Sequence, residues 1–105
     1  MLIIRMPAKF VQLLKGTGNK KYKVVFFDAM RKKISSTQFG DVNYQDYTQH
    51  NDMVRQQSYI SRHKCNEDWN NFMTAGALSF HLLWSKPTLS GAYKAYRKKF
   101  GLELY

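Results

Sequence analysis

Cysteine, proline and acidic residues are all scarce in this chain of 105 residues. The single cysteine, Cys65, cannot form an internal disulfide, so we expect a fold that gains nothing from oxidation and assembles inside a cell. Only seven Asp and Glu face seventeen Lys and Arg, which gives a formal charge of +10. Because the surface must therefore carry a positive potential, the candidate partners are nucleic acid, acidic protein surfaces and anionic lipid.

Long uncharged apolar runs are also missing. The apolar start of the chain is interrupted by Arg5, Lys9 and Lys15, so we expect neither a signal peptide nor a membrane span. The hydrophobic share of 44% and the aromatic share of 15% are nevertheless too high for a disordered tail. The length fits one domain with one core.

The hydrophobic period changes from two to about 3.6 after Gly40. Tyr22, Val24 and Phe26 alternate along a strand, and a second run ending at Phe39 completes a β-hairpin. Beyond it the pattern predicts helices over 52–63, 74–84 and 88–100, the second of them apolar almost all round. We therefore predict a small single α+β domain, in which a two-stranded antiparallel hairpin packs on about three helices.

The helix boundaries follow from capping residues. Asp52, Thr74 and Thr88 precede the three runs as N-caps, and Gly101 ends the last one. In the first helix the spacing predicts that Val54, Tyr59 and Ile60 face inward, while Arg55, Gln56 and Arg62 face outward.

Residues 1–19 are predicted to form an arm and hinge before a basic α+β domain over 20–105. Pro7 and the apolar residues after it predict a short amphipathic helix that ends at Gly16 and needs a surface to lie on. Because a Gly16–Gly18 hinge follows, we expect this arm to bind a neighbouring subunit rather than to complete the domain's own core. Its expected contact residues are Leu2, Ile3, Ile4, Phe10, Val11, Leu13 and Leu14.

No catalytic or metal-binding constellation is visible. The potential metal ligands are His50, His63, Cys65 and His81, but only His63 and Cys65 are close in sequence, and one residue between them is fewer than structural zinc sites use. A Cys65 nucleophile with a histidine base lacks a nucleophile elbow. We expect no enzyme activity, no metal, no cofactor and no small-molecule substrate, and we expect His81 to be a hydrogen-bonded core histidine.

The positive charge clusters in two stretches, Arg5 to Lys33 and Lys86 to Lys99. Between them, the segment Ile34 to Val54 has no Lys or Arg. Lysines and arginines interleaved with tyrosines suit phosphate contact plus base stacking, although the same tyrosines have core-facing spacing and a basic patch can also dock on acidic protein. The predicted basic surface consists of Lys20, Lys21, Lys23, Arg31, Lys32, Lys33, Lys94, Arg97, Lys98 and Lys99.

From about Lys20 to Leu102 the order of motifs resembles a family of small basic proteins of unknown activity from nucleocytoplasmic large DNA viruses, of the algal-virus and giant-virus type. The motifs are KKYKVVFFD, TQFG, DYTQHND, YISRHK, NEDW, MTAGALSFHLLWSKPTL and YRKKFGL, of which MTAGALS to KPTL is the most specific. The chain departs from the family pattern at DAMRKK and NNFMT. The resemblance implies a viral context and assigns no site residues.

Together these lines favour a virion structural protein, a minor capsid component that cements or bridges other capsid proteins after assembly in the host cytoplasm. The aromatic surplus suits such interfaces. The alternative is an accessory protein that binds nucleic acid without sequence specificity, and a weaker third option is an enzyme subunit or regulator. Contact with a membrane surface stays open.

Overall fold

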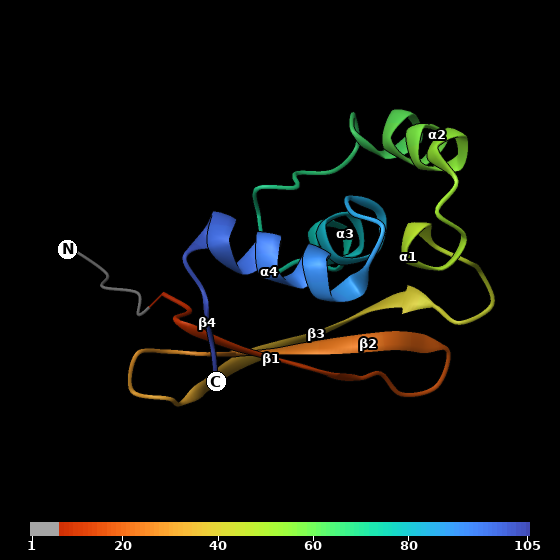
Figure 1. Cartoon of the computed structure of the whole chain (residues 1–105). Coiled ribbons are helices and arrows are strands. Elements are labelled where there is room, and N and C mark those ends of the chain that lie inside the picture. Colours follow the sequence, from red (N-terminus) through yellow and green to blue (C-terminus); the bar gives the residue numbers. More distant parts are fainter. Residues whose placement is uncertain (1–6) are drawn as a thin grey trace.

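A computed structural model describes residues 7–105 as an α+β domain in two layers, a four-stranded sheet with helices on one face (Figure 1). The elements are β1 (Phe10–Lys15), β2 (Lys20–Phe27), β3 (Lys33–Asp41), α1 (Tyr47–His50), α2 (Met53–His63), α3 (Ala75–Leu78), the π-helix η1 (Ser79–Trp84), α4 (Leu89–Phe100) and β4 (Glu103–Leu104).

The strand order is β3-β2-β1-β4, with β2 antiparallel to both of its neighbours and β4 parallel to β1. The prediction of an α+β domain is confirmed, but the prediction of a two-stranded hairpin is wrong. The hairpin of β2 and β3 exists, and it is extended by β1 and β4. Both added strands depend on pairing between distant parts of the chain, which local periodicity does not reveal.

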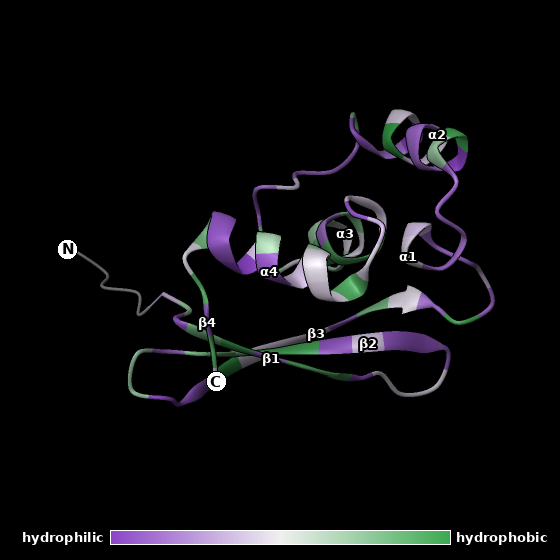
Figure 2. Cartoon of the chain, in the orientation of Figure 1, coloured by the Kyte–Doolittle hydropathy of each residue, from purple (hydrophilic) through white to green (hydrophobic). Residues whose placement is uncertain are grey.

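The core lies between the sheet and the helices. Along β2 the chain changes from hydrophilic at Lys20 to hydrophobic toward Phe27 (Figure 2), and Val24 and Phe26 are fully buried against the helical layer. The helices contribute the fully buried Leu78 and Leu82. The predicted central run over 74–84 is therefore the core element, as expected.

The predicted helix boundaries are confirmed by their caps. The side chain of Asp52 accepts hydrogen bonds from the backbone of Val54 and Arg55, and Thr74 and Thr88 cap α3 and α4 in the same way. Gly101 ends α4 with a φ of 66°, a conformation that costs glycine little. One detail was not predicted: the central run leaves the α-helical pattern at Ser79 and continues as a π-helix to Trp84.

The predicted N-terminal helix is wrong. Residues 10–15 form β1, an interior strand of the sheet, and Val11 is fully buried in the domain's own core. The apolar positions between Phe10 and Leu14 have helical spacing, but so short a run is also compatible with a strand that is apolar on both faces, and the partners β2 and β4 decide between them. A division into an arm over 1–19 and a domain over 20–105 therefore separates strands that form one sheet.

No helix within residues 7–105 is long and apolar enough to cross a membrane.

Candidate functional site

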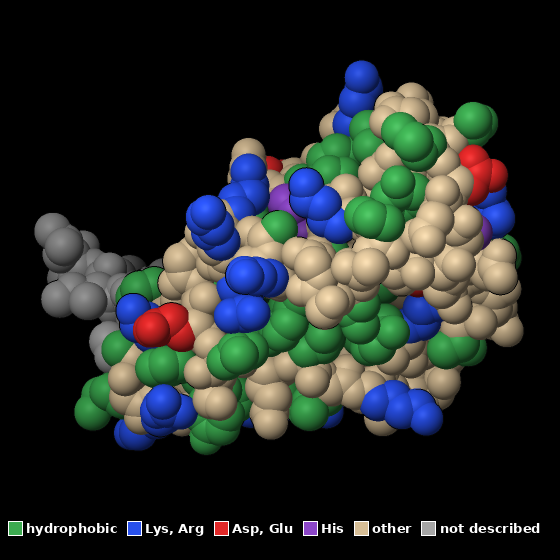
Figure 3. Space-filling model, in the orientation of Figure 1, with side chains coloured by type: hydrophobic (Ala, Val, Ile, Leu, Met, Phe, Trp, Pro, Cys, Tyr) green, Lys and Arg blue, Asp and Glu red, His purple; other side chains and the backbone are tan. Residues whose placement is uncertain are grey.

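The ten residues of the predicted basic surface lie on two separate parts of the fold. Lys20, Lys21 and Lys23 belong to β2, the next three lie at or beside the β2–β3 turn, and the last four are on α4. The sheet and α4 form different layers, so the fold does not gather the ten into one site. On the face drawn in Figure 3, Lys and Arg side chains gather over α4 and reappear at the sheet below it.

Few of the basic side chains are neutralised. Among residues 7–105, Lys9 pairs with Glu103 at 3.1 Å and Lys21 pairs with Asp46 at 2.6 Å, and no other Lys or Arg there has a carboxylate within 4.0 Å. The pair of Lys21 and Asp46 is buried, with only 10% and 5% of the side chains exposed. Lys21 is therefore a structural residue, whereas most of the predicted basic surface is free to meet an external anion.

Arg31 and Arg97 also make cation–π contacts within the domain. The Arg31 guanidinium lies 4.4 Å from the ring centroid of Phe10 and 5.4 Å from that of Tyr105, while Arg97 lies 4.9 Å from that of Tyr93. Cation–π contacts of this kind stabilise the local packing. The freest members of the predicted surface are consequently lysines, notably Lys94 and Lys98 on the exposed side of α4, whereas Lys99 Nζ lies 5.8 Å from the ring centroid of Phe100.

The predicted protein-interaction residues are divided by the fold. Leu2, Ile3 and Ile4 lie outside the described residues. Val11 is fully buried and therefore unavailable to a partner, Leu13 is partly buried and packs against the same core, and 37% of Leu14 is exposed. The prediction that these residues bind a neighbouring subunit rather than complete the domain's own core is thus wrong for Val11 and Leu13.

The potential metal ligands are not brought together. Among residues 7–105 no three His, Cys, Asp or Glu side chains are grouped closely enough to hold a metal ion. Cys65 is exposed, and His81 is buried, where its Nε2 donates a hydrogen bond to the carbonyl of Trp69 at 2.7 Å. The predicted hydrogen-bonded core histidine is therefore confirmed.

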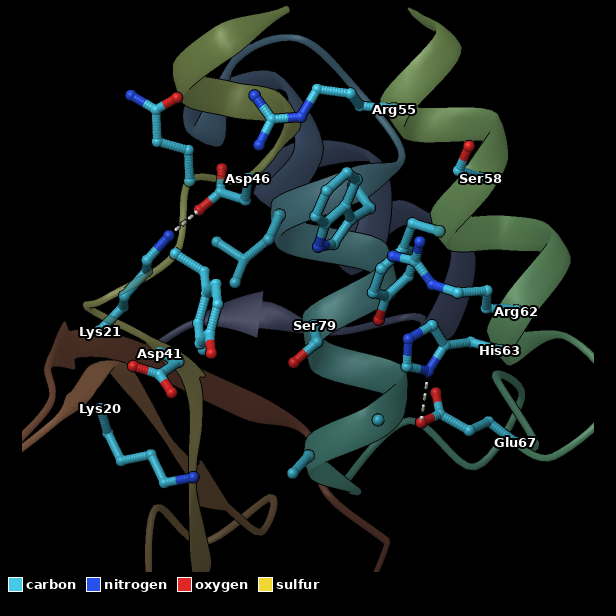
Figure 4. Close-up of a pocket in the computed structure, with 18 residues that line it drawn as sticks. Lys20, Lys21, Asp41, Asp46, Arg55, Ser58, Arg62, His63, Glu67 and Ser79 are labelled. Carbon is cyan, nitrogen blue, oxygen red and sulfur yellow. Dashed lines mark hydrogen bonds and ion pairs between the residues drawn. The ribbon is translucent and has the colours of Figure 1, made fainter. Parts of the chain in front are cut away.

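A cleft of about 840 Å³ opens between α2, the open end of the β2–β3 hairpin and η1 (Figure 4). Its lining includes four cationic and three anionic side chains: Lys20, Lys21, Arg55 and Arg62, and Asp41, Asp46 and Glu67. Its volume lies within the range of about 300–1,000 Å³ that is usual for small-molecule sites.

Three stacked rings form one wall of the cleft. Tyr59 lies between His63, with 4.3 Å between ring centroids, and Trp84, with 4.4 Å. Burial raises the pKa of the Tyr59 phenol far above its usual range, and the charge of Glu67 adds to that shift, so Tyr59 keeps its proton at any physiological pH. The phenol is consequently a permanent hydrogen-bond donor at this wall.

The carboxylate of Glu67 holds the ring of His63 in place. Its Nδ1 lies 3.4 Å from a carboxylate oxygen of Glu67, whose other oxygen accepts a hydrogen bond from the indole of Trp69 at 3.0 Å. A Cβ at Gly76 would come within 2.8 Å of the same carboxylate, so the absence of a side chain there makes room for Glu67. This arrangement fixes the histidine ring against Tyr59.

Sequence reasoning missed the cleft. Arg55 and Arg62, expected outward, are indeed exposed, but they line the cleft. Val54 was expected inward, although 76% of it is exposed. Gln56, expected outward, instead donates a hydrogen bond to the carbonyl of Trp84 at 2.9 Å. One signal was available: Arg55, Ser58, Tyr59 and Arg62 recur at spacings of three and four residues, which places them along one side of a helix.

Comparison with known proteins adds one match. No curated protein and no solved structure matches the chain. Residues 15–63, which run from the end of β1 through α2 and include the sheet and α2 walls of the cleft, match a family of unknown function (DUF5754). The chain is thus similar to this family over that range, and the match assigns no activity to it.

Proposed function

We propose that the protein binds nucleic acid through backbone phosphates and without sequence preference. In the viral setting that the sequence resemblance implies, this binding would neutralise or package the genome. The observation that supports it is the excess of free cations: within residues 7–105, every Lys and Arg except Lys9 and Lys21 lacks a carboxylate partner. Phosphate contacts made by such side chains supply most of the affinity of non-specific binding.

The lysines of α4 are the best candidates for these contacts. Lys94 and Lys98 are exposed, stand one turn apart on the same side of the helix and take part in no ion pair or cation–π contact. Cations in the last turn also stabilise a helix through its dipole, which accounts for part of the cluster. Lys94 stands in the middle of α4, where the dipole gives it no such advantage.

The test measures affinity for a random-sequence DNA duplex as a function of salt. If about six phosphates are engaged, log affinity should fall against log salt with a slope near −5, and the double variant Lys94→Ala, Lys98→Ala should reduce that slope by about 2. The control Lys64→Ala removes one exposed charge at the end of α2 that is not part of the predicted basic surface. Absence of binding at tens of micromolar protein in low salt would exclude this function.

We propose the capsid-bridging role as a second candidate, because α2 begins with two exposed apolar side chains. Met53 is 67% and Val54 is 76% exposed, and 71% of Tyr44 is exposed in the loop before α1. Apolar and aromatic side chains left in water suit a protein partner. Val54→Asp should abolish incorporation into particles without changing DNA affinity, and normal incorporation of this variant would argue against the role.

A further inference from the structure

The cleft between α2 and the sheet presents hydrogen-bond donors that the protein itself does not use. The indole Nε1 of Trp84, the phenol of Tyr59 and the hydroxyl of Ser79 all belong to cleft residues, and none of them makes a hydrogen bond to another residue within 7–105. An indole N–H can only donate, and Tyr59 remains protonated. A ligand with several acceptor oxygens can therefore satisfy all three groups at once.

The charges of the cleft leave two arginines unmatched. Lys21 and Asp46 neutralise each other, and Glu67 lies beside His63 and accepts a hydrogen bond from Trp69. Lys20 and Asp41 are register partners but form no ion pair, so the four cationic and three anionic side chains of the cleft leave one net positive charge. Arg55 and Arg62 have no carboxylate within 4.0 Å among residues 7–105 and extend from α2 over the cleft (Figure 4). The unpaired cations of the cleft are thus these two arginines of α2 and Lys20 of β2.

The position of Arg55 lowers the stability of α2 itself. It stands in the first turn of α2, which contains no acidic residue, and a cation there opposes the helix dipole. Arg62, seven residues later, lies about 10 Å farther along the axis. The two guanidinium groups therefore leave α2 about two turns apart, on the side that lines the cleft.

The cleft is too large for a lone anion. Its volume of about 840 Å³ also takes in the apolar surfaces of Leu83 and Trp84. We propose that this cleft binds a phosphorylated ligand of nucleotide size, with the phosphate at Arg62 and Ser79 and the organic part against Leu83 and Trp84. Guanidinium matches phosphate with paired hydrogen bonds, and the remaining phosphate oxygens accept from the hydroxyls.

This ligand is either a free nucleotide or the 5′-phosphorylated end of a strand, since both carry a phosphate monoester on a nucleoside. This proposal does not rest on the proposed nucleic-acid binding, because the lysines of α4 do not line the cleft that would bind a free nucleotide.

The experiment titrates the full chain with adenosine 5′-monophosphate, adenosine and inorganic phosphate by calorimetry at low salt. We expect the nucleotide to bind and adenosine to bind at least about tenfold more weakly, since it lacks the charged group. Arg62→Ala should weaken nucleotide binding about tenfold, and Arg62→Lys, which keeps the charge and loses the fork, should lie between. Both changes are at an exposed position and leave the core intact.

The matched control is Lys64→Ala, which removes one positive charge two residues away without lining the cleft. Its nucleotide affinity should stay within about twofold of the unchanged protein, as expected for a screened surface charge. Equal losses in Arg62→Ala and Lys64→Ala, equal affinities for nucleotide and adenosine, or no nucleotide binding at millimolar concentration would each overturn the proposal.

Two oligonucleotides of one sequence, with a 5′-phosphate or a 5′-hydroxyl, distinguish the two sources. Tighter binding of the phosphorylated strand, lost in Arg62→Ala, identifies the strand end as the ligand. Equal binding of both strands, together with binding of the free nucleotide, identifies the nucleotide. The Lys94→Ala, Lys98→Ala variant should weaken both strands equally and leave the affinity for the free nucleotide unchanged.

Discussion

The phenol ring of Tyr59 lies flat on the indole ring of Trp84, with 4.4 Å between ring centroids and 4° between ring planes. Tyr59 is the buried residue of α2, and Gln56 on the same helix donates a hydrogen bond to the carbonyl of Trp84. Much of the attachment of α2 to the domain is therefore made at one residue of η1. The same attachment positions the arginines of the cleft.

Tyr59→Ala should detach α2 more than it disturbs the sheet. Truncating a buried aromatic side chain costs about 3–5 kcal/mol in a well-packed core, and we expect about 2–3 kcal/mol here because α2 packs at the margin of the core. Amide exchange should accelerate throughout 53–63 and stay slow in β2. Val54→Ala, at an exposed position of the same helix, should change stability by less than about 0.5 kcal/mol. Uniform acceleration of exchange would show that α2 is not a separate unit.

Val11→Ala tests whether the N-terminal strand belongs to the core. Removing two methyl groups from a fully buried valine should lower the free energy of unfolding by about 2 kcal/mol, through lost burial plus the cavity left behind. The neighbouring Gln12 is exposed, so Gln12→Ala should have little effect. Both values come from denaturant titration. If the two variants are equally stable, β1 lies outside the core and a free N-terminal arm becomes the better description.

The elements that the sequence predicts correctly are those whose evidence is local. Asp52, Thr74 and Thr88 cap their helices by hydrogen bonds within three residues. The β-branched and aromatic run of β2 likewise indicates a strand by itself, although its last four residues are all buried. The sequence predicts a helix at β1 because its apolar positions have helical spacing, but six residues are too few for that spacing to decide the conformation. Its pairing with β2 and with β4, which is more than eighty residues away in the chain, decides the conformation.

The same distinction between local evidence and tertiary packing applies to the candidate site. Composition alone predicts a basic surface, and the exposed lysines of α4 agree with it. The cleft needs Arg62 from α2, Ser79 from η1 and Asp41 from β3 to meet, which is a consequence of tertiary packing. The burial of Lys21 beside Asp46 was equally invisible, because in the sequence Lys21 looks the same as the free Lys20 and Lys23.

His81 should make stability depend on pH. Burial lowers the pKa of His81 below its usual value of about 6.5, the hydrogen bond to the Trp69 carbonyl opposes that shift, and the charge of Lys99 adds to it. The unfolded chain therefore binds a proton at a higher pH than the folded one. The resulting stability is present above pH 6.5 and is lost as the pH falls toward the folded pKa.

Unfolding titrations of the unchanged protein and of His81→Gln between about pH 7.5 and 5.5 isolate this contribution, because the two proteins share every other ionisable group. The difference in free energy of unfolding between the two proteins should shrink as the pH falls. A constant difference across this range would show that His81 does not change its proton affinity on folding.

Gly40 and Gly18 allow backbone strain to be separated from crowding. Both have positive φ, 79° and 61°, so alanine at either position adopts an unfavourable left-handed conformation that costs about 1–2 kcal/mol. A Cβ at Gly18 would meet no atom within 4 Å, whereas at Gly40 it would lie 3.0 Å from Leu83 Cδ1 and 3.1 Å from Lys21 Cβ. Gly40→Ala must therefore also move a buried side chain of η1, which adds roughly 1–3 kcal/mol. We expect Gly40→Ala to be the less stable variant in denaturant titration by about that amount, and equal losses would mean that the hairpin end and η1 do not pack as closely as the structure places them.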